Sequence, residues 1–208
     1  MSIELTASER IARIRSDFRM GVAVGFRSGL EKWLVASSET ITLSRFNGMR
    51  KLGPLELAIT DWRAQTLSTW ATDGDIARLA IPDDKDLDWV HSVCDPSDDF
   101  NTPLKGPFTP IFGGSADVSR TALAICKTAH LIPSAVMVNI TDQDIVGLDF
   151  VDLEQILSLI LNPSNQLIEV SAANVPLQVA EASRVHVFRP QDGGEEHYAI
   201  EIGNPDRN

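Results

Sequence analysis

The segment GGSADVSR, residues 113–120, combines the residue types that can hold an anion at the start of a helix. Its glycine pair frees the backbone, and Ser115 or Asp117 could accept hydrogen bonds from the first free N–H groups of a following helix. Arg120 falls in the first turn of that helix, at the end where the helix dipole favours negative charge. Three interpretations are open here: a phosphate-binding turn, the remnant of one, or a well-capped helix without a ligand.

Neither the histidines nor any nucleophile motif defines a second candidate site. The histidines are expected singly, at the surface or at helix ends, because their spacing never matches a metal site: His91, His130, His186 and His197. His186 and His197 fall on the two arms of an expected hairpin and could face each other across it. The sequence has no G-x-S-x-G turn, Walker motif or G-x-G-x-x-G fingerprint. The residues alone therefore predict no catalytic set and no metal site.

Acidic residues and cysteines are also weak signals. Aspartates are dense between residues 83 and 99, but their spacing lacks the mid-loop glycine and terminal glutamate of an EF-hand, so a solvated acidic loop is expected. Cys94 and Cys126 are too few for a disulfide framework or a cysteine-based zinc site. Cys126 falls on an apolar helix face and is expected to be a buried small hydrophobic residue.

The composition is that of an ordinary globular protein with an acidic balance. The chain has 208 residues, of which 43% are hydrophobic and 23% charged, and its formal net charge is -11. That charge argues against binding to nucleic acid or to an anionic membrane, whose phosphates attract clustered lysine and arginine. The N-terminus MSIELTASER has no signal-peptide hydrophobic region, and no apolar run is long enough to span a membrane. We expect a cytoplasmic protein.

Apolar spacing predicts helices that alternate with short apolar strands, which is the pattern of an α/β fold. Thr6 and Glu9 have capping-box spacing at the start of the first helix, and the strand at 134–140 is expected to be a buried parallel strand. Four of the expected helices lie at 7–19, 42–49, 85–93 and 153–160. Another begins at Thr60 or Asp61. A further helix follows the glycine pair, with a buried stripe of Val118, Ala122, Ile125 and Ala129. The expected strands lie at 21–26, 33–37, 55–59, 134–140 and 167–170, and 79–110 outside its helix is expected to be loop.

The C-terminal part has a different pattern. Two antiparallel strands, about 184–189 and 196–202, are expected around a turn at 190–194. We therefore expect a domain boundary near residue 176, with an α/β domain at 1–175 and the start of a second domain at 176–208. One face of this hairpin is apolar and is expected to be exposed in this chain: Val185, Val187, Tyr198, Ile200 and Ile202.

In its order of elements, the chain resembles dihydroxybutanone phosphate synthase over about residues 7–172. The best-matching stretches are ASSETIT (36–42), PLELAITDWRAQTL (54–67) and TALAICKTAHLIPSAVMVNITDQD (121–144). Residues 175–208 resemble the opening hairpin of GTP cyclohydrolase II, which follows the synthase domain in fused riboflavin proteins. The whole chain is most similar to the GTP cyclohydrolase II variant with a degenerate synthase domain. The resemblance implies an α/β/α fold that is usually dimeric.

The chain departs from the synthase pattern at its catalytic positions. The synthase has a long acidic loop for magnesium and sugar phosphate, whereas the connection here, FRSGLEK, has Glu31 as its single carboxylate. The synthase's His-Thr-Glu is matched by Val118, Ser119 and Arg120, and neither valine nor arginine can replace the acid–base groups. The resemblance therefore implies no catalytic residues and no metal here, but a vestigial anion pocket of Arg27, Glu31, Ser119 and Arg120.

These observations favour a non-catalytic N-terminal domain that dimerises and supports the cyclohydrolase part of a riboflavin-biosynthesis protein. The expected partners are a second copy and a C-terminal cyclohydrolase domain. No cofactor is expected on this chain, because the zinc-binding cysteines of that family would follow residue 208. Two alternatives stay open: a divergent sugar-phosphate enzyme that uses Arg27, Glu31, Ser119 and Arg120, and a stand-alone module that senses a riboflavin precursor.

Overall fold

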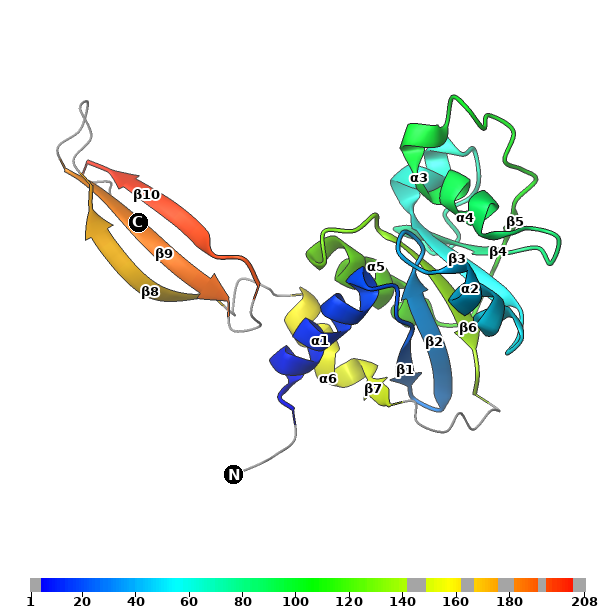
Figure 1. The fold of residues 1–208 in the computed structure, drawn as a ribbon, viewed down its shortest axis with the longest axis horizontal. Coiled ribbons are helices and arrows are strands. Elements are labelled where there is room, and N and C mark those ends of the chain that lie inside the picture. The colour runs from blue at the N-terminus through cyan, green and yellow to red at the C-terminus, as the bar shows by residue number, and fades with distance from the viewer. Residues whose placement is uncertain (1–4, 142–148, 162–166, 176–181, 191–193, 204–208) are drawn as a thin grey trace.

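Figure 1 shows the fold in a computed structural model, which describes residues 5–141, 149–161, 167–175, 182–190 and 194–203. The helices are α1 (Ala7–Arg19), α2 (Leu43–Arg50), α3 (Asp61–Thr66), α4 (Leu87–Cys94), α5 (Asp117–Thr128) and α6 (Leu153–Leu161), with a 3-10 turn η1 (Pro96–Asp98) after α4. The strands are β1 (Val24–Ser28), β2 (Glu31–Ser37), β3 (Leu55–Thr60), β4 (Ile76–Ala80), β5 (Thr109–Pro110), β6 (Ser134–Asn139), β7 (Phe150–Asp152), β8 (Leu167–Asn174), β9 (Ser183–Pro190) and β10 (His197–Ile202). Among these residues, no helix has the length and apolar character needed to cross a bilayer.

The larger sheet has seven strands in the order β5-β4-β3-β6-β2-β1-β7. The expectation of a parallel strand at 134–140 is wrong, because β6 runs antiparallel to both of its neighbours, β2 and β3. The only parallel pair among the described strands joins β1 to β7. A continuous apolar run indicates burial on both faces, and a central antiparallel strand between two helical layers meets that condition as well as a parallel one.

Two hydrophobic cores lie on opposite faces of this sheet, which confirms the expected α/β/α fold. Residues of α1, α5 and α6 form one core, and residues of α2, α3 and α4 form the other. Of the expected stripe, Val118, Ala122 and Ile125 are buried in the first core, and Ala129, the C-cap residue of α5, is buried as well. We refer to the first side as the α5 face.

Helix starts follow the expected capping chemistry. Thr6 and Glu9 form a complete capping box at α1, and Thr60 caps α3. At α5 the N-cap position is Ala116, which offers no side-chain bond, while the Ser115 hydroxyl accepts the N–H of Asp117 at 3.2 Å. The strands β4 and β5 have no counterpart in the sequence-based prediction, because β4 has an arginine at its centre that breaks the apolar pattern.

The second sheet has three antiparallel strands in the order β10-β9-β8 and lies apart from the first (Figure 1). The hairpin of β9 and β10 is as expected, but the strand at 167–170 was expected in the α/β layers and instead pairs with β9 as part of β8. A local apolar pattern does not specify which strand it will pair with. The expected boundary near residue 176 thus falls between two paired strands, and the turn expected at 190–194 lies partly outside the described residues.

The two faces of the second sheet differ in polarity. Tyr198, Ile200 and Ile202 are each at least 60% exposed on one face, as expected, whereas Val185 and Val187 on the same face are half-buried. His186 and His197 do not face each other, because the strand register places His186 opposite Ala199. Instead, the His186 ring lies between two carboxylates, with Nδ1 3.1 Å from Glu169 and Nε2 3.1 Å from Glu201.

Candidate functional site

The start of α5 lies beside the N-terminal end of β4, where Arg120 of the helix contacts Asp73 and Asp75. The Arg120 guanidinium donates from Nε to Asp75 Oδ1 at 2.9 Å and from Nη2 to the backbone carbonyl of Asp73 at 2.9 Å. Its Nη1 also lies 3.6 Å from Asp117. The positive charge of Arg120 is therefore already matched by carboxylates of the chain itself, and these occupy the directions in which an anionic ligand would be bound.

The two residues before Arg120 are buried. Val118 is 3% exposed and belongs to the hydrophobic core on the α5 face, and Ser119 is 1% exposed. Neither side chain is presented to solvent at the helix start. The alkyl side chain of Val118 has no group that can exchange a proton, so its role here is packing.

Arg78 is the central side chain of this region, and sequence reasoning missed it. Its side chain is 5% exposed and donates to both carboxylate oxygens of Asp73, at 2.9 and 3.1 Å. Its Nη2 also donates to the carbonyl of Gly113 at 2.6 Å. Gly113 and Gly114 both have positive φ, which explains why glycines occupy the turn that brings this carbonyl to Arg78. Burial acts to raise the pKa of Asp73, but the hydrogen bonds from Arg78 and Thr72 outweigh it, so this pKa lies below its ordinary value.

Glu56 is a second buried group that the sequence did not single out. The strand register aligns Glu56 with Ala80 and Ala58 with Arg78, so Glu56 and Arg78 lie on the same face of the sheet. Burial raises the pKa of Glu56, against the attraction of the Arg78 charge, and its Oε2 is buried without a hydrogen-bond partner among the described residues. It is therefore a carboxyl group that can hold a proton closer to neutral pH than an ordinary glutamate.

The β1–β2 connection carries the other two candidate residues, and they lie on different faces. Phe26 packs in the core of the α5 face, so Arg27, the next residue of the strand, points to the opposite face. There Arg27 lies 3.7 Å from Asp152. Glu31 accepts a hydrogen bond from the indole N–H of Trp33 at 3.0 Å, and Trp33 packs in the core of the α5 face. The structure therefore does not bring Arg27 together with Ser119 and Arg120.

The site on the α5 face thus holds two internally paired arginines and one buried carboxyl group. Within the described ranges, no group of three or more histidine, cysteine or acidic side chains could hold a metal ion. Cys94 and Cys126 are both buried, and burial raises the pKa of each thiol, that of Cys126 to about 12, so neither is a ready nucleophile.

Comparisons with solved structures place the fold in a known class. The chain is similar to a 3,4-dihydroxy-2-butanone 4-phosphate synthase in its cation-free form, with a TM-score of 0.52 and 15% identity over 74% of this chain and 98% of that one. It is similar to the synthase of Candida albicans, with a TM-score of 0.51 and 14% identity over 72% and 96% of the two chains. The fold is that of the dihydroxybutanone phosphate synthases.

The sequence comparison leads to one particular kind of protein. The chain is 28% identical over 211 residues to GTP cyclohydrolase-2 of Azospirillum brasilense, which covers 97% of this chain and 52% of that protein. The chain therefore spans about half the length of this curated relative. No family model matches it. Together these likenesses confirm the resemblance seen in the sequence, to a synthase-like domain of a GTP cyclohydrolase II-type protein.

Proposed function

We propose that this chain is a non-catalytic N-terminal domain of a GTP cyclohydrolase II-type protein of riboflavin biosynthesis, where it dimerises and supports the cyclohydrolase part. The observation that supports this most is the start of α5, where Val118 packs in the core and Arg120 is paired with Asp75. A zinc ion would then belong to the cyclohydrolase part. We further propose a cytoplasmic location without nucleic-acid or membrane partners, in keeping with the net charge of -11.

The charge pairs argue against turnover of a sugar phosphate at this site. Such an enzyme needs a cation free to hold the phosphate and a positioned group that moves a proton. On the α5 face, the guanidinium groups of Arg78 and Arg120 already donate to Asp73 and Asp75. Each guanidinium charge on this face is therefore already compensated by a carboxylate, which leaves no excess positive charge to hold a phosphate.

We expect the purified chain to leave both ribulose 5-phosphate and GTP unchanged, with and without added magnesium. Chromatography of the two compounds after prolonged incubation measures this directly. The competing hypothesis, a divergent sugar-phosphate enzyme, is favoured by one observation, the buried Glu56 with its raised pKa. Turnover of ribulose 5-phosphate that is lost in both Glu31→Ala and Glu56→Gln would replace our proposal with that enzyme.

We also expect a homodimer, because a subunit interface is a feature that a synthase-like domain can keep without its catalytic residues. Stable interfaces usually bury more than about 1,200 Å² in total, so the dimer should persist at micromolar concentration. Light scattering coupled to size exclusion gives the mass directly against the 22.8 kDa of one chain. A monomer across the concentration range would remove dimerisation from the proposed function.

A further inference from the structure

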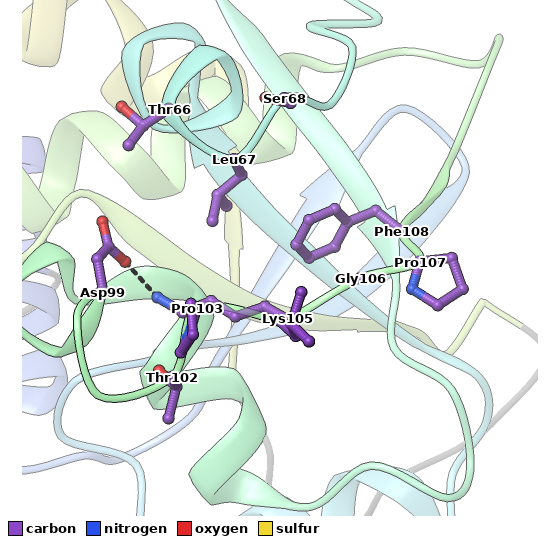
Figure 2. Close-up of a pocket in the computed structure, with 11 residues that line it drawn as sticks. Thr66, Leu67, Ser68, Asp99, Thr102, Pro103, Lys105, Gly106, Pro107 and Phe108 are labelled. Atoms are coloured by element: carbon purple, nitrogen blue, oxygen red, sulfur yellow. Dashed lines mark hydrogen bonds and ion pairs between the residues drawn. The ribbon is translucent and has the colours of Figure 1, made fainter.

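A cavity of about 640 Å³ lies away from the α5 face, between the end of α3 and the loop that follows η1. Figure 2 shows Leu67 and Phe108 directed into it from different sides, with the pair of Asp99 and Lys105 along one wall. Thr66 and Ser68 belong to its lining as well. Its volume falls within the range of pockets that hold small molecules.

The charged residues in the lining of this cavity are Asp99 and Lys105, and the buried cation Arg63 contacts Asp99 from outside the lining. Arg63 donates from Nη1 to Asp99 Oδ2 at 2.6 Å and from Nη2 to Oδ1 at 2.7 Å, and Lys105 Nζ donates to Oδ1 as well. The side chains of Arg63 and Lys105 are 9% and 4% exposed. One further carboxylate, that of Asp95, lies near Arg63 and accepts a hydrogen bond from the Ser97 N–H. The cluster beside the cavity therefore has two buried positive charges, on Arg63 and Lys105, against the one partly exposed carboxylate of Asp99 that both contact.

The two cations differ in how far their donors are satisfied. Beyond Asp99, Arg63 donates from Nε to the Val93 carbonyl at 2.6 Å and from Nη2 to the Ser92 carbonyl at 3.2 Å. Lys105 has three N–H donors and, among the described residues, Asp99 is its sole acceptor. Two donors of a buried ammonium group thus lack acceptors within the described part of the chain, which is costly unless water or a ligand supplies them.

We propose that this cavity binds a small phosphomonoester, with its phosphate on Lys105. A phosphate carries close to two negative charges near pH 7 and three strong acceptor oxygens, so it matches both the excess charge and the free donors. Leu67 and Phe108 supply apolar contact for the body of the ligand, and Ser68 supplies polar contact. The site shares no residue with the α5 face and does not depend on the proposed function.

Calorimetric titration of the full chain with ribose 5-phosphate, and with ribose as its neutral counterpart, tests the proposal. We expect saturable binding of the phosphate ester alone, weakened at least tenfold in Lys105→Gln because a charged hydrogen bond is lost. The control is Lys85→Gln, an exposed lysine paired with Asp84, which should bind as the wild type does. Circular dichroism establishes that each variant is folded.

A second variant keeps the test decisive if Lys105→Gln fails to fold. Thr66 is exposed at the cavity rim, so Thr66→Trp fills the space without altering the contact between Lys105 and Asp99. It too should lose binding of ribose 5-phosphate. The proposal is overturned if the folded wild type shows no saturable binding up to about 10 mM. Equal binding of ribose, or wild-type binding in Thr66→Trp, would overturn it as well.

Discussion

Replacing Asp99 by asparagine is expected to lower the free energy of unfolding at pH 7 by about 3 kcal/mol, because it leaves two buried cations without their shared carboxylate. The side chains of Arg63 and Lys105 are nearly inaccessible to water, so solvent cannot compensate for the lost charge. Asp99 itself is 29% exposed, which places the expected loss at the lower end for a broken buried ion pair. Urea denaturation followed by tryptophan fluorescence measures the change.

Asp84→Asn is the matched control for this substitution. Asp84 pairs with Lys85 at 3.3 Å, but the two side chains are 73% and 38% exposed, so the pair contributes at most about 1 kcal/mol. We expect the free energy of unfolding of Asp84→Asn to lie within about 0.5 kcal/mol of the wild-type value. If both variants lose the same stability, the cluster of Arg63, Asp99 and Lys105 has no special energetic role.

The effect of Asp99→Asn should also depend on pH. Hydrogen bonds from Arg63 and Lys105 hold the pKa of Asp99 well below its usual range in the folded protein, whereas the unfolded chain has an ordinary value of about 3.9. The folded state therefore binds fewer protons between those two values, and this contribution to stability is complete above about pH 5 and is lost as the pH falls below about 4. The stability difference between wild type and variant should shrink between pH 5 and pH 3. A constant difference would contradict the assignment.

Arg78→Met is expected to destabilise the chain by about 2 kcal/mol, while Arg120→Met should cost less than about 1 kcal/mol. Both arginines pair with aspartates that precede β4, but Arg78 is buried, and its loss removes the donor to the Gly113 carbonyl and two of the hydrogen bonds to Asp73. The pair of Arg120 and Asp75 is 40% and 62% exposed, so water replaces it at little cost. Denaturation of the two variants under the same conditions gives the comparison.

An independent measurement separates the loss of this ion pair from a general loss of packing. Arg78 and Thr72 hold the pKa of Asp73 down against the effect of burial, so the pKa of Asp73 should rise in Arg78→Met. Carboxyl-carbon NMR titration reports it residue by residue. Equal destabilisation by the two substitutions, or an unchanged pKa of Asp73, would show that Arg78 does not organise the turn at Gly113.

Features that depend only on neighbours along the chain could be predicted from the sequence. The capping box of Thr6 and Glu9, the buried stripe of α5 and the hairpin of β9 and β10 follow from spacing within about a dozen residues. Helix period, caps and strand alternation are local properties, because each is set by backbone geometry over a few residues. The absence of acid–base groups at Val118 and Arg120 also follows from the sequence, because it needs only the residue types at the positions that match the synthase's histidine and glutamate.

Tertiary structure alone decided which distant segments meet. The antiparallel setting of β6, the pairing of β8 with β9 and the placement of Arg27 away from Ser119 all depend on strand pairing, which a segment's own apolar pattern does not encode. Arg63 and Lys105 reach Asp99 from separate segments, and neither has a local signal that marks it as buried. Charged residues are expected from sequence to be solvated, so the burial of Arg63 and Lys105 around one carboxylate is visible only in the packed structure.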